Sequence, residues 1–373
     1  MKQRNINLDV IRIVAMIMVV VLHTFKNFVE RPDFFNTPLY WALLPLVIIS
    51  NPAVIIFFIL SGYLVLNKPR TIKGNLQRTL DRLVLPLFFF ESLNLLHFYT
   101  KVLSWGSPFH YFVTTEFRRL ISFPSSPLWF LYVLISFYLL NPLLQPLFTE
   151  NKRKLAQYLT LLAFILAFAI AAAELPADRV GEIYTIFTSW LGFIAFYLYG
   201  GLLAKGWGIS LKLSQWMGIL GLAFASHLSL DHLVASMEAN GQAIIPLLQW
   251  LMQLVWYAAP ILVGISTVQI LLMVNWKGLL RKAAHRDKWA RLTAALASLS
   301  FGVYLIHPLI IDPVLRIWFG WWYEAVNLHP IVYNILNFVF VFGLSMLMTF
   351  LIGRVPHLRA IIGEPTKSRN VTL

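Results

Sequence analysis

The sequence predicts an all-α membrane protein, a polytopic transmembrane helix bundle of about ten spans with both termini in the cytoplasm. Three observations support this prediction. Of 373 residues, 59% are hydrophobic and only 12% are charged, whereas soluble proteins are about 25% charged. Apolar runs of about 20 residues, the length that crosses a bilayer, recur along the chain. Lys and Arg gather in the short segments between alternate runs, which is typical of cytoplasmic loops.

Ten apolar stretches are expected to span the membrane as helices. They are roughly 8–28, 51–66, 83–102, 128–148, 155–173, 184–204, 214–230, 244–273, 296–318 and 331–353. An additional apolar segment, 39–50, is flanked or broken by Pro45 and Pro52 and is expected to lie in the interface or to re-enter the membrane. The predicted organisation is one transmembrane domain over 1–353, followed by a short basic cytoplasmic tail at 354–373.

The basic residues test this topology independently. With the N-terminus inside, 22 of the 30 Lys and Arg residues fall on the cytoplasmic side and 7 on the other, as the positive-inside rule requires. The net charge of +14 is thereby explained by topology, so membrane lipid is an expected partner and nucleic acid is not. We expect a multi-pass protein of the cell inner membrane or plasma membrane. The absence of cysteine excludes disulfides, thiolate metal sites and a cysteine nucleophile.

The first span carries an acid, an arginine and a histidine, which distinguish it from an ordinary membrane helix. A charge near the middle of a span costs roughly 2.5–3.5 kcal/mol, yet Asp9, Arg12 and His23 all occur here. At 100° per residue His23 returns to within roughly 20° of Arg12, and Asp9 lies roughly 40–60° away. The three side chains therefore form one stripe, which must face protein or a wet cavity. Asp9 and Arg12 also interrupt any signal-peptide pattern, so the span is expected to be retained.

Other polar residues have both functional and structural interpretations. Ser61 and Gly62 end the second span and suit close helix packing. Arg78 and Arg82, one helical turn apart, suit phosphate recognition, but they could equally be topogenic charges or contacts to anionic lipid. Glu91 is an acid within the third span, with a structural ion pair as the alternative to a substrate contact.

Two later spans also carry candidate residues. Trp129 begins the fourth span, where a tryptophan is usually an interfacial anchor. In the ninth span Ser300, Tyr304 and His307 share one helix face, a pattern that ordinary helix–helix hydrogen bonding also produces. No His pair has metal-ligand spacing with supporting acids, so no metal is predicted.

Taken in order, these motifs resemble the integral-membrane acyltransferase-3 family over nearly the whole chain. The residues that carry the resemblance are Leu8-Asp9, Arg12 and His23; Phe57-Phe58 and Ser61-Gly62-Tyr63; Arg82-Leu83 and Pro86; Trp129-Phe130-Leu131, Tyr138 and Pro142; and Ser300-Phe301-Gly302, Tyr304-Leu305 and His307-Pro308. One departure is that the family often spaces its two arginines three residues apart, whereas Arg78 and Arg82 are four apart, with Asp81 at the usual second position.

The resemblance implies transfer of an acyl group, most simply acetyl from acetyl-CoA, to a hydroxyl of a cell-surface or lipid-linked carbohydrate. A neutral imidazole is the usual base for such a hydroxyl, which makes His23 the candidate, with Arg12 and Asp9 supporting the site. Donor binding is expected at Arg78, Arg82, Ser61 and Gly62. The substrate cavity is expected to include Glu91, Trp129, Tyr304 and His307.

Two alternatives stay open at the level of the sequence. Intramembrane Asp9, Arg12, His23 and Glu91 would also suit a transporter or flippase of a polar solute or acylated glycan precursor. Paired, interrupted half-helices would favour that class, and the sequence does not contain paired halves. A weaker third interpretation is a scaffold for envelope-polymer assembly.

Overall fold

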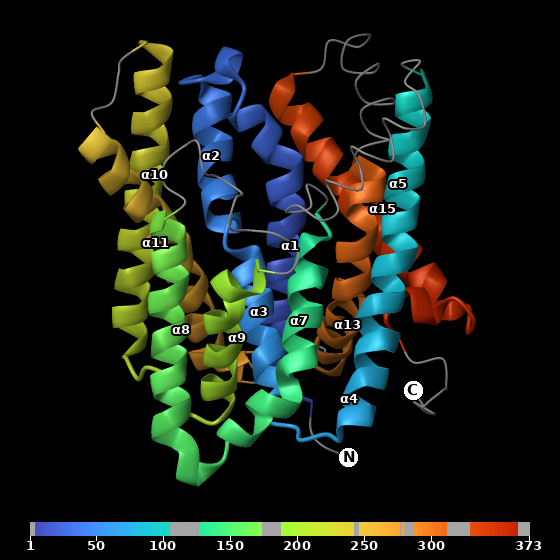
Figure 1. Cartoon of the computed structure of the whole chain (residues 1–373). Coiled ribbons are helices and arrows are strands. Elements are labelled where there is room, and N and C mark those ends of the chain that lie inside the picture. The colour runs from blue at the N-terminus through green and yellow to red at the C-terminus, as the bar shows by residue number, and fades with distance from the viewer. Residues whose placement is uncertain are drawn as a thin grey trace. The chain divides into compact units, whose positions relative to one another are not determined.

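The computed structural model describes residues 4–104, 127–173, 188–241, 246–276, 278–279, 286–311 and 329–364. Within these ranges the chain is helical, with no β-strand (Figure 1), which confirms the predicted all-α class. Most of the aromatic segment 103–127 lies outside the described residues.

The long helices follow the predicted order of spans. They are α1 (Ile6–Val29), α2 (Pro38–Ser50), α3 (Ala53–Val65), α5 (Leu85–Ser104), α7 (Trp129–Leu144), α8 (Arg153–Ala173), α9 (Trp190–Ala204), α10 (Leu213–Ala239), α11 (Pro246–Met273), α13 (Arg286–Ile310) and α15 (Pro330–Arg354). Short helical segments join some of them: η1 (Pro32–Phe34), α4 (Ile72–Thr79), η2 (Leu80–Val84), η3 (Gln145–Leu147), η4 (Glu150–Lys152) and η6 (Arg359–Ile362).

Eight stretches among the described residues are long and apolar enough to cross a membrane. They are Ile6–Lys26, Pro38–Val65, Trp129–Leu147, Glu150–Ile170, Leu213–Met237, Met252–Met273, Lys288–Ile310 and Pro330–Arg354. The helix α9 is apolar but shorter, and α5 occupies the predicted third span. The protein is therefore a multi-pass membrane protein, while the count of ten spans and the side of each terminus stay predictions.

Three local features differ from the sequence expectation. The segment 39–50 is helix α2, and only Asn51 and Pro52 separate it from α3. The basic segment after the second span is helical from Ile72 and continues through the π-helical turn η2 into α5. The helix α13 begins ten residues before the expected start of the ninth span, so Lys288 and Arg291 are helical and exposed.

The described chain forms two compact units. Unit 1 comprises Met1–Leu60, Ile209–Ser300 and Leu315–Gly343. Within it α1 packs on α2 and α10 packs on α11. The α1–α2 contact is built from Phe25, Leu39, Leu43 and Val47, and Phe338 closes on Phe25 with a ring separation of 5.9 Å.

Unit 2 comprises Ser61–Gly208, Phe301–Val314 and Leu344–Leu373. Its helix α9 packs on both α8 and α7, and α4 packs on α7 (Figure 1). The rings of Phe137 on α7 and Tyr197 on α9 stack at 4.8 Å. Gly302 packs so closely on Thr349 that an added Cβ would lie 2.2 Å from its side chain.

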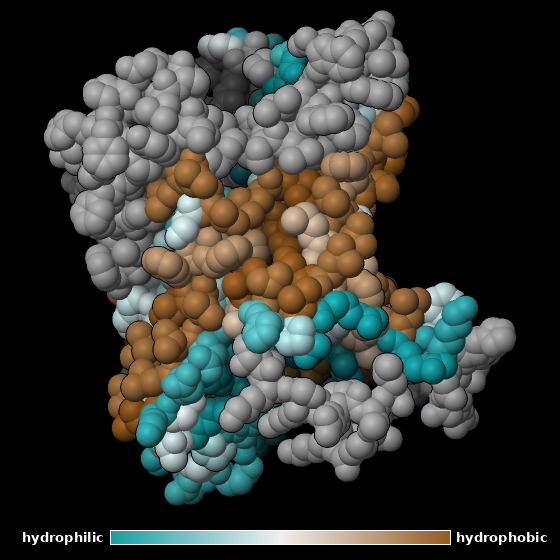
Figure 2. Space-filling model, turned by 90° about the vertical axis from the view of Figure 1, so that its right-hand side faces the viewer, coloured by the Kyte–Doolittle hydropathy of each residue, from teal (hydrophilic) through white to brown (hydrophobic). Residues whose placement is uncertain are grey.

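Large apolar side chains cover much of the exposed surface. On α8 the exposed residues include Leu155, Leu161, Ile165 and Phe168, and a similar row runs along α10. One face of the molecule is a broad hydrophobic band with hydrophilic residues gathered beyond it (Figure 2). Soluble monomers rarely expose apolar patches of this extent, so these surfaces are suited to lipid.

Candidate active site

The predicted site residues fall into two groups, one in each unit. Asp9, Arg12 and His23 belong to α1 in unit 1. The members of the second group all lie in unit 2; they are Ser61, Gly62, Arg78, Arg82, Glu91, Trp129, Tyr304 and His307.

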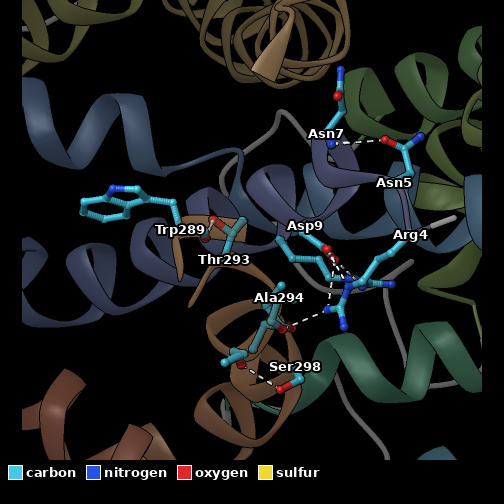
Figure 3. Close-up of polar contacts among 12 residues, drawn as sticks. Arg4, Asn5, Asn7, Asp9, Trp289, Thr293, Ala294 and Ser298 are labelled. Carbon is cyan, nitrogen blue, oxygen red and sulfur yellow. Dashed lines mark hydrogen bonds and ion pairs between the residues drawn. The ribbon is translucent and has the colours of Figure 1, made fainter. Parts of the chain in front are cut away.

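In unit 1, Asp9 is the centre of a cluster of charges. Its carboxylate is only 3% exposed and accepts from two guanidinium groups. Arg12 Nη1 lies 3.1 Å from Asp9 Oδ1, and Arg4 Nε lies 2.6 Å from Asp9 Oδ2. Arg4 Nη2 also donates to Asp9 Oδ1 at 3.2 Å and to the carbonyl oxygen of Ala294 on α13 at 2.8 Å (Figure 3).

Hydrogen bonds around this cluster hold the N-terminal end of α1 in place. The side chain of Asn5 caps the helix by accepting from the backbone N–H of Asn7 at 3.1 Å, so Arg4 immediately precedes the first turn. Asn7 Nδ2 donates to the carbonyl oxygen of Leu272 on α11 at 2.7 Å. Arg4 and Asn7 thus tie the start of α1 to two other helices of unit 1.

Arg4 was not among the predicted site residues. Two guanidinium groups on one carboxylate leave the cluster with a net single positive charge, so Asp9 holds both cations in place. Sequence reasoning counted Arg4 only as a cytoplasmic basic residue, because nothing in its spacing distinguishes it from Lys2. The ion pair between Asp9 and Arg12 agrees with their predicted position on one stripe of the helix.

His23 lies eleven residues beyond Arg12 on the same helix, about 16 Å along its axis at 1.5 Å per residue. Its side chain is partly buried. The next two residues, Thr24 and Phe25, are buried, and Thr24 Oγ1 donates to the carbonyl oxygen of Val20 at 2.8 Å. Arg12 is consequently too distant to orient the imidazole directly.

In unit 2 the structure brings several predicted cavity residues together around Tyr304. The Tyr304 hydroxyl donates to the carbonyl oxygen of Pro127, just before α7. Its ring meets that of Phe130 edge to face at 5.4 Å, and the ring of His307 lies 5.9 Å away. Trp129, between Pro127 and Phe130, packs on Phe193 at 5.1 Å.

The hydrogen bonds of His307 define its tautomer. The ring is fully buried, and Nδ1 lies 2.8 Å from the carbonyl oxygen of Tyr304 and 3.2 Å from that of Val303. Carbonyl oxygens only accept, so in the neutral ring Nδ1 carries the proton and Nε2 holds the lone pair. His307 therefore presents a basic nitrogen, as a second candidate base would.

Glu91 is buried on α5, where Asn94 Nδ2 donates to its Oε2 at 3.4 Å. The carboxylate is close enough to Tyr304 and to Tyr132 to interact electrostatically with both. Glu91 and Tyr304, predicted separately from two spans, thus belong to one neighbourhood of unit 2.

Gly62 has a packing role that its sequence context suggested. A Cβ at this position would lie 1.8 Å from the carbonyl oxygen of Tyr197, so only glycine allows α3 to approach α9 this closely. The neighbouring Ser61 is partly buried. The proposed contact of these two residues with a donor stays a prediction.

Arg78 and Arg82 occupy different environments in unit 2. Arg78 is partly buried, and its Nε is fully buried with no hydrogen-bond partner. Arg82 is exposed in the turn η2, and its carbonyl oxygen would lie 2.9 Å from a Cβ at Gly363. The acid between them, Asp81, accepts from Gln77 at 2.9 Å.

A buried polar network beside Arg78 was not predicted. Asn75 is fully buried and its side chain accepts from Asn141 Nδ2 at 3.4 Å. Tyr197 donates to Asn141 Oδ1 at 2.6 Å, while Asn75 Nδ2 donates to the carbonyl oxygen of Tyr138 at 2.5 Å. These residues lie on α4, α7 and α9, so no local spacing in the sequence connects them.

Among the described residues, no group of three or more His, Asp or Glu side chains could hold a metal ion. The described site residues offer imidazole, carboxylate, hydroxyl and guanidinium groups.

Comparison with known proteins identifies a family for this chain. The acyltransferase-3 family model, described as an acyltransferase domain, matches residues 5–354. No curated protein and no solved structure matched the chain. The matched stretch contains every predicted site residue and begins one residue after Arg4.

Proposed function

Because the chain belongs to the integral-membrane acyltransferase-3 family and is a multi-pass membrane acyltransferase, we propose a specific reaction for it. The proposed reaction moves an acyl group, acetyl in the simplest case, from acyl-CoA to a hydroxyl of a cell-surface or lipid-linked carbohydrate. The observation that carries the proposal is the polar stripe of α1, where two guanidinium groups hold Asp9 and His23 follows on the same helix.

In the proposed step His23 is the general base. The neutral imidazole takes the proton of the acceptor hydroxyl while its oxygen attacks the thioester carbonyl carbon. The C–O bond forms, the C–S bond breaks, and the CoA thiolate leaves and is protonated to the free thiol. Arg12, held by Asp9, supplies a fixed positive charge for an anionic part of the donor.

The second group of residues binds the substrates in this proposal. Arg78 and Arg82 meet donor phosphates, and Ser61 with Gly62 lines the path of the donor. Glu91, Trp129, Tyr304 and His307 shape the cavity for the acceptor, where aromatic rings and a carboxylate suit a sugar ring with its hydroxyls. The ring of Tyr304 lies 5.9 Å from that of His307, which supports a shared substrate contact.

The test is acyl transfer by the purified protein. Detergent-solubilised protein is supplied with acetyl-CoA, and thiol release is followed with and without added carbohydrate acceptors. We expect thiol release above that of the His23→Ala variant, and an increase when a suitable acceptor is present. Mass spectrometry of surface glycans from cells with and without the gene then identifies the acceptor.

A transporter or flippase gives a different result. Solute counterflow in proteoliposomes, without thiol release from acyl-CoA under any acceptor, would contradict the proposed reaction. Acyl transfer without counterflow would support it.

A further inference from the structure

The loop after α3 places one arginine at a fixed position in unit 2. The backbone N–H of Arg70 donates to Oε1 of Gln145 at 3.2 Å. Nε2 of the same amide donates to the carbonyl oxygens of Lys68 at 3.0 Å and Val65 at 3.2 Å. Gln145 is itself buried at the end of α7. Three hydrogen bonds to one buried side chain thus hold the backbone that carries Arg70.

Arg78, on α4, also has a backbone that buried hydrogen bonds hold in place. Asn75, one turn before Arg78, joins the buried network with Asn141 and Tyr197. This network anchors α4 to α7 through neutral groups only. Arg78 therefore projects from an anchored helix, and its Nε is buried without a hydrogen-bond partner. A buried, unsatisfied guanidinium N–H is costly, because it loses its contacts with water.

The two guanidinium groups act on each other. Partial desolvation and the nearby positive charge of Arg78 both lower the pKa of Arg70. Among the described residues no carboxylate pairs with either side chain. Like charges held close together without a counterion destabilise the folded state, whereas a bound anion would relieve both the repulsion and the unsatisfied N–H.

The ordinary explanation is that both arginines only set membrane topology. Lys73, on the same helix, fits that explanation because it is exposed to water. Arg78 does not, because topogenic charge needs neither a buried Nε nor a second cation beside it. Arg70 is exposed at the surface of the protein, so a ligand from solution can reach the two arginines.

We propose that Arg70 and Arg78 form a phosphate-binding site whose inner side is the neutral network of Asn75, Asn141 and Tyr197. Two planar guanidinium groups match a phosphate dianion in charge and in hydrogen-bond geometry. The inference rests on the proposed function in one respect, since it assigns this phosphate to the acyl donor. The proposal adds Arg70 to the residues that bind the acyl donor. Arg78 then shares the phosphate with Arg70 rather than with Arg82.

Binding of inorganic pyrophosphate and of CoA to the purified full chain tests the site. Isothermal titration calorimetry is carried out at about 0.15 M salt, which screens weak surface attraction. Arg70→Gln and Arg78→Gln are each expected to weaken binding of both ligands about 10- to 100-fold, the effect of losing a charge-assisted hydrogen bond. Lys73→Gln, the matched control on the same helix, is expected to change it less than about 2-fold.

Folding is checked separately, because Arg78 is partly buried. Arg70→Gln changes an exposed side chain and removes the repulsion with Arg78, so its ligand-free thermal midpoint should equal or slightly exceed that of the parent protein. If Arg70→Gln and Lys73→Gln bind pyrophosphate equally well, the proposed site is wrong.

The source of the phosphate is resolved by competition. The titration is repeated in nanodiscs of neutral phosphatidylcholine and in nanodiscs containing anionic phosphatidylglycerol. If CoA binds equally well in both kinds of nanodisc, the phosphate belongs to the acyl donor. Loss of Arg70-dependent CoA binding only in the anionic nanodiscs would overturn that assignment and identify a lipid headgroup as the occupant. Binding is measured without turnover, so the two proposals can fail separately. If binding depends on Arg70 but no acyl transfer occurs, the proposed function is wrong and the phosphate-binding site is still supported.

Discussion

His23 carries the most specific prediction at the scale of single residues. It is the titratable base on the polar stripe of α1, and a positioned general base contributes about 10²–10⁴-fold to a rate. His23→Ala is therefore expected to lower acyl transfer at least about 100-fold while expression and membrane insertion stay normal. The measurement is thiol release from acetyl-CoA by equal amounts of inserted protein.

His357→Ala is the matched control for this variant, because His357 is exposed. It should retain full activity. Near-normal transfer by His23→Ala would refute the assignment of the base. His307, whose Nδ1 is held by backbone carbonyl oxygens, would then be the next candidate.

Arg12 is expected to depend on geometry as well as charge. Arg12→Lys keeps the positive charge but loses the planar fork that faces Asp9, so insertion should persist and kcat should fall about tenfold or more. Arg31→Lys, which changes an exposed arginine paired with Asp33, is the control and should leave kcat unchanged.

Arg4 is expected to act through Asp9, as a positioning residue. Arg4→Gln should lower kcat less than Arg12→Lys does, with little change in KM for acyl-CoA, and Arg4→Lys should restore part of the loss. In a double-mutant cycle, Arg4→Gln and Asp9→Asn should be non-additive, because the two residues share one ion pair. Strictly additive effects would show that the cluster does not work as a unit.

These same residues show which contacts could not be predicted from the sequence. Helical periodicity placed Asp9 near Arg12 because both lie on one helix. It could not pair Arg4 with Ala294, which is 290 positions away, or Arg70 with Gln145. Long-range contacts of this kind depend on which helices pack together, and hydropathy alone does not determine that.

At the scale of helices, Gly62 gives the sharpest stability prediction. Gly62→Ala would place a methyl group against the Tyr197 carbonyl, which is backbone and cannot rotate away. Overpacking of this kind costs about 1–3 kcal/mol, so the thermal midpoint should fall in a fixed detergent. Gly218→Ala on α10 is the control, because nothing lies within 4 Å of its added Cβ.

Gly218→Ala should be neutral or slightly stabilising, since alanine favours a helix over glycine. Equal midpoints for the two variants would contradict the close approach of α3 and α9. The sequence had already indicated this approach, because small residues in membrane helices commonly mark tight contacts.

The segment between α3 and α5 shows where element prediction failed. It was expected to be a basic inner loop, but α4 and the π-helical turn η2 make it helical up to α5. Its polar composition did not indicate a helix, although buried Asn75 holds this helix against α7 by a hydrogen bond to Tyr138. A helix held by specific hydrogen bonds leaves little signal in hydropathy.

For the whole molecule, the membrane topology is the first testable consequence. Reporter fusions after Lys73, Lys154 and Lys205 should report the cytoplasm, and fusions after Glu30 and Asn240 should report the opposite side. These positions lie at or near helix ends, and the basic ones belong to the predicted inner segments. If Glu30 and Lys73 reported the same side, or if Lys205 and Asn240 did, the ten-span topology would be refuted.

The sidedness of the substrates follows from that topology. Arg70 and Arg78 both belong to the predicted cytoplasmic segment between the second and third spans. The phosphates of CoA cannot enter hydrocarbon without matched cations, so the donor should be usable only from the side that presents these arginines.

In sealed vesicles of one orientation, acyl-CoA should support transfer only when supplied on the cytoplasmic face. A surface carbohydrate acceptor should react only from the opposite face. Transfer that requires donor and acceptor together on the cytoplasmic face would mean that the acceptor is acylated before it leaves the cell, and His23 would then have to be reached from within.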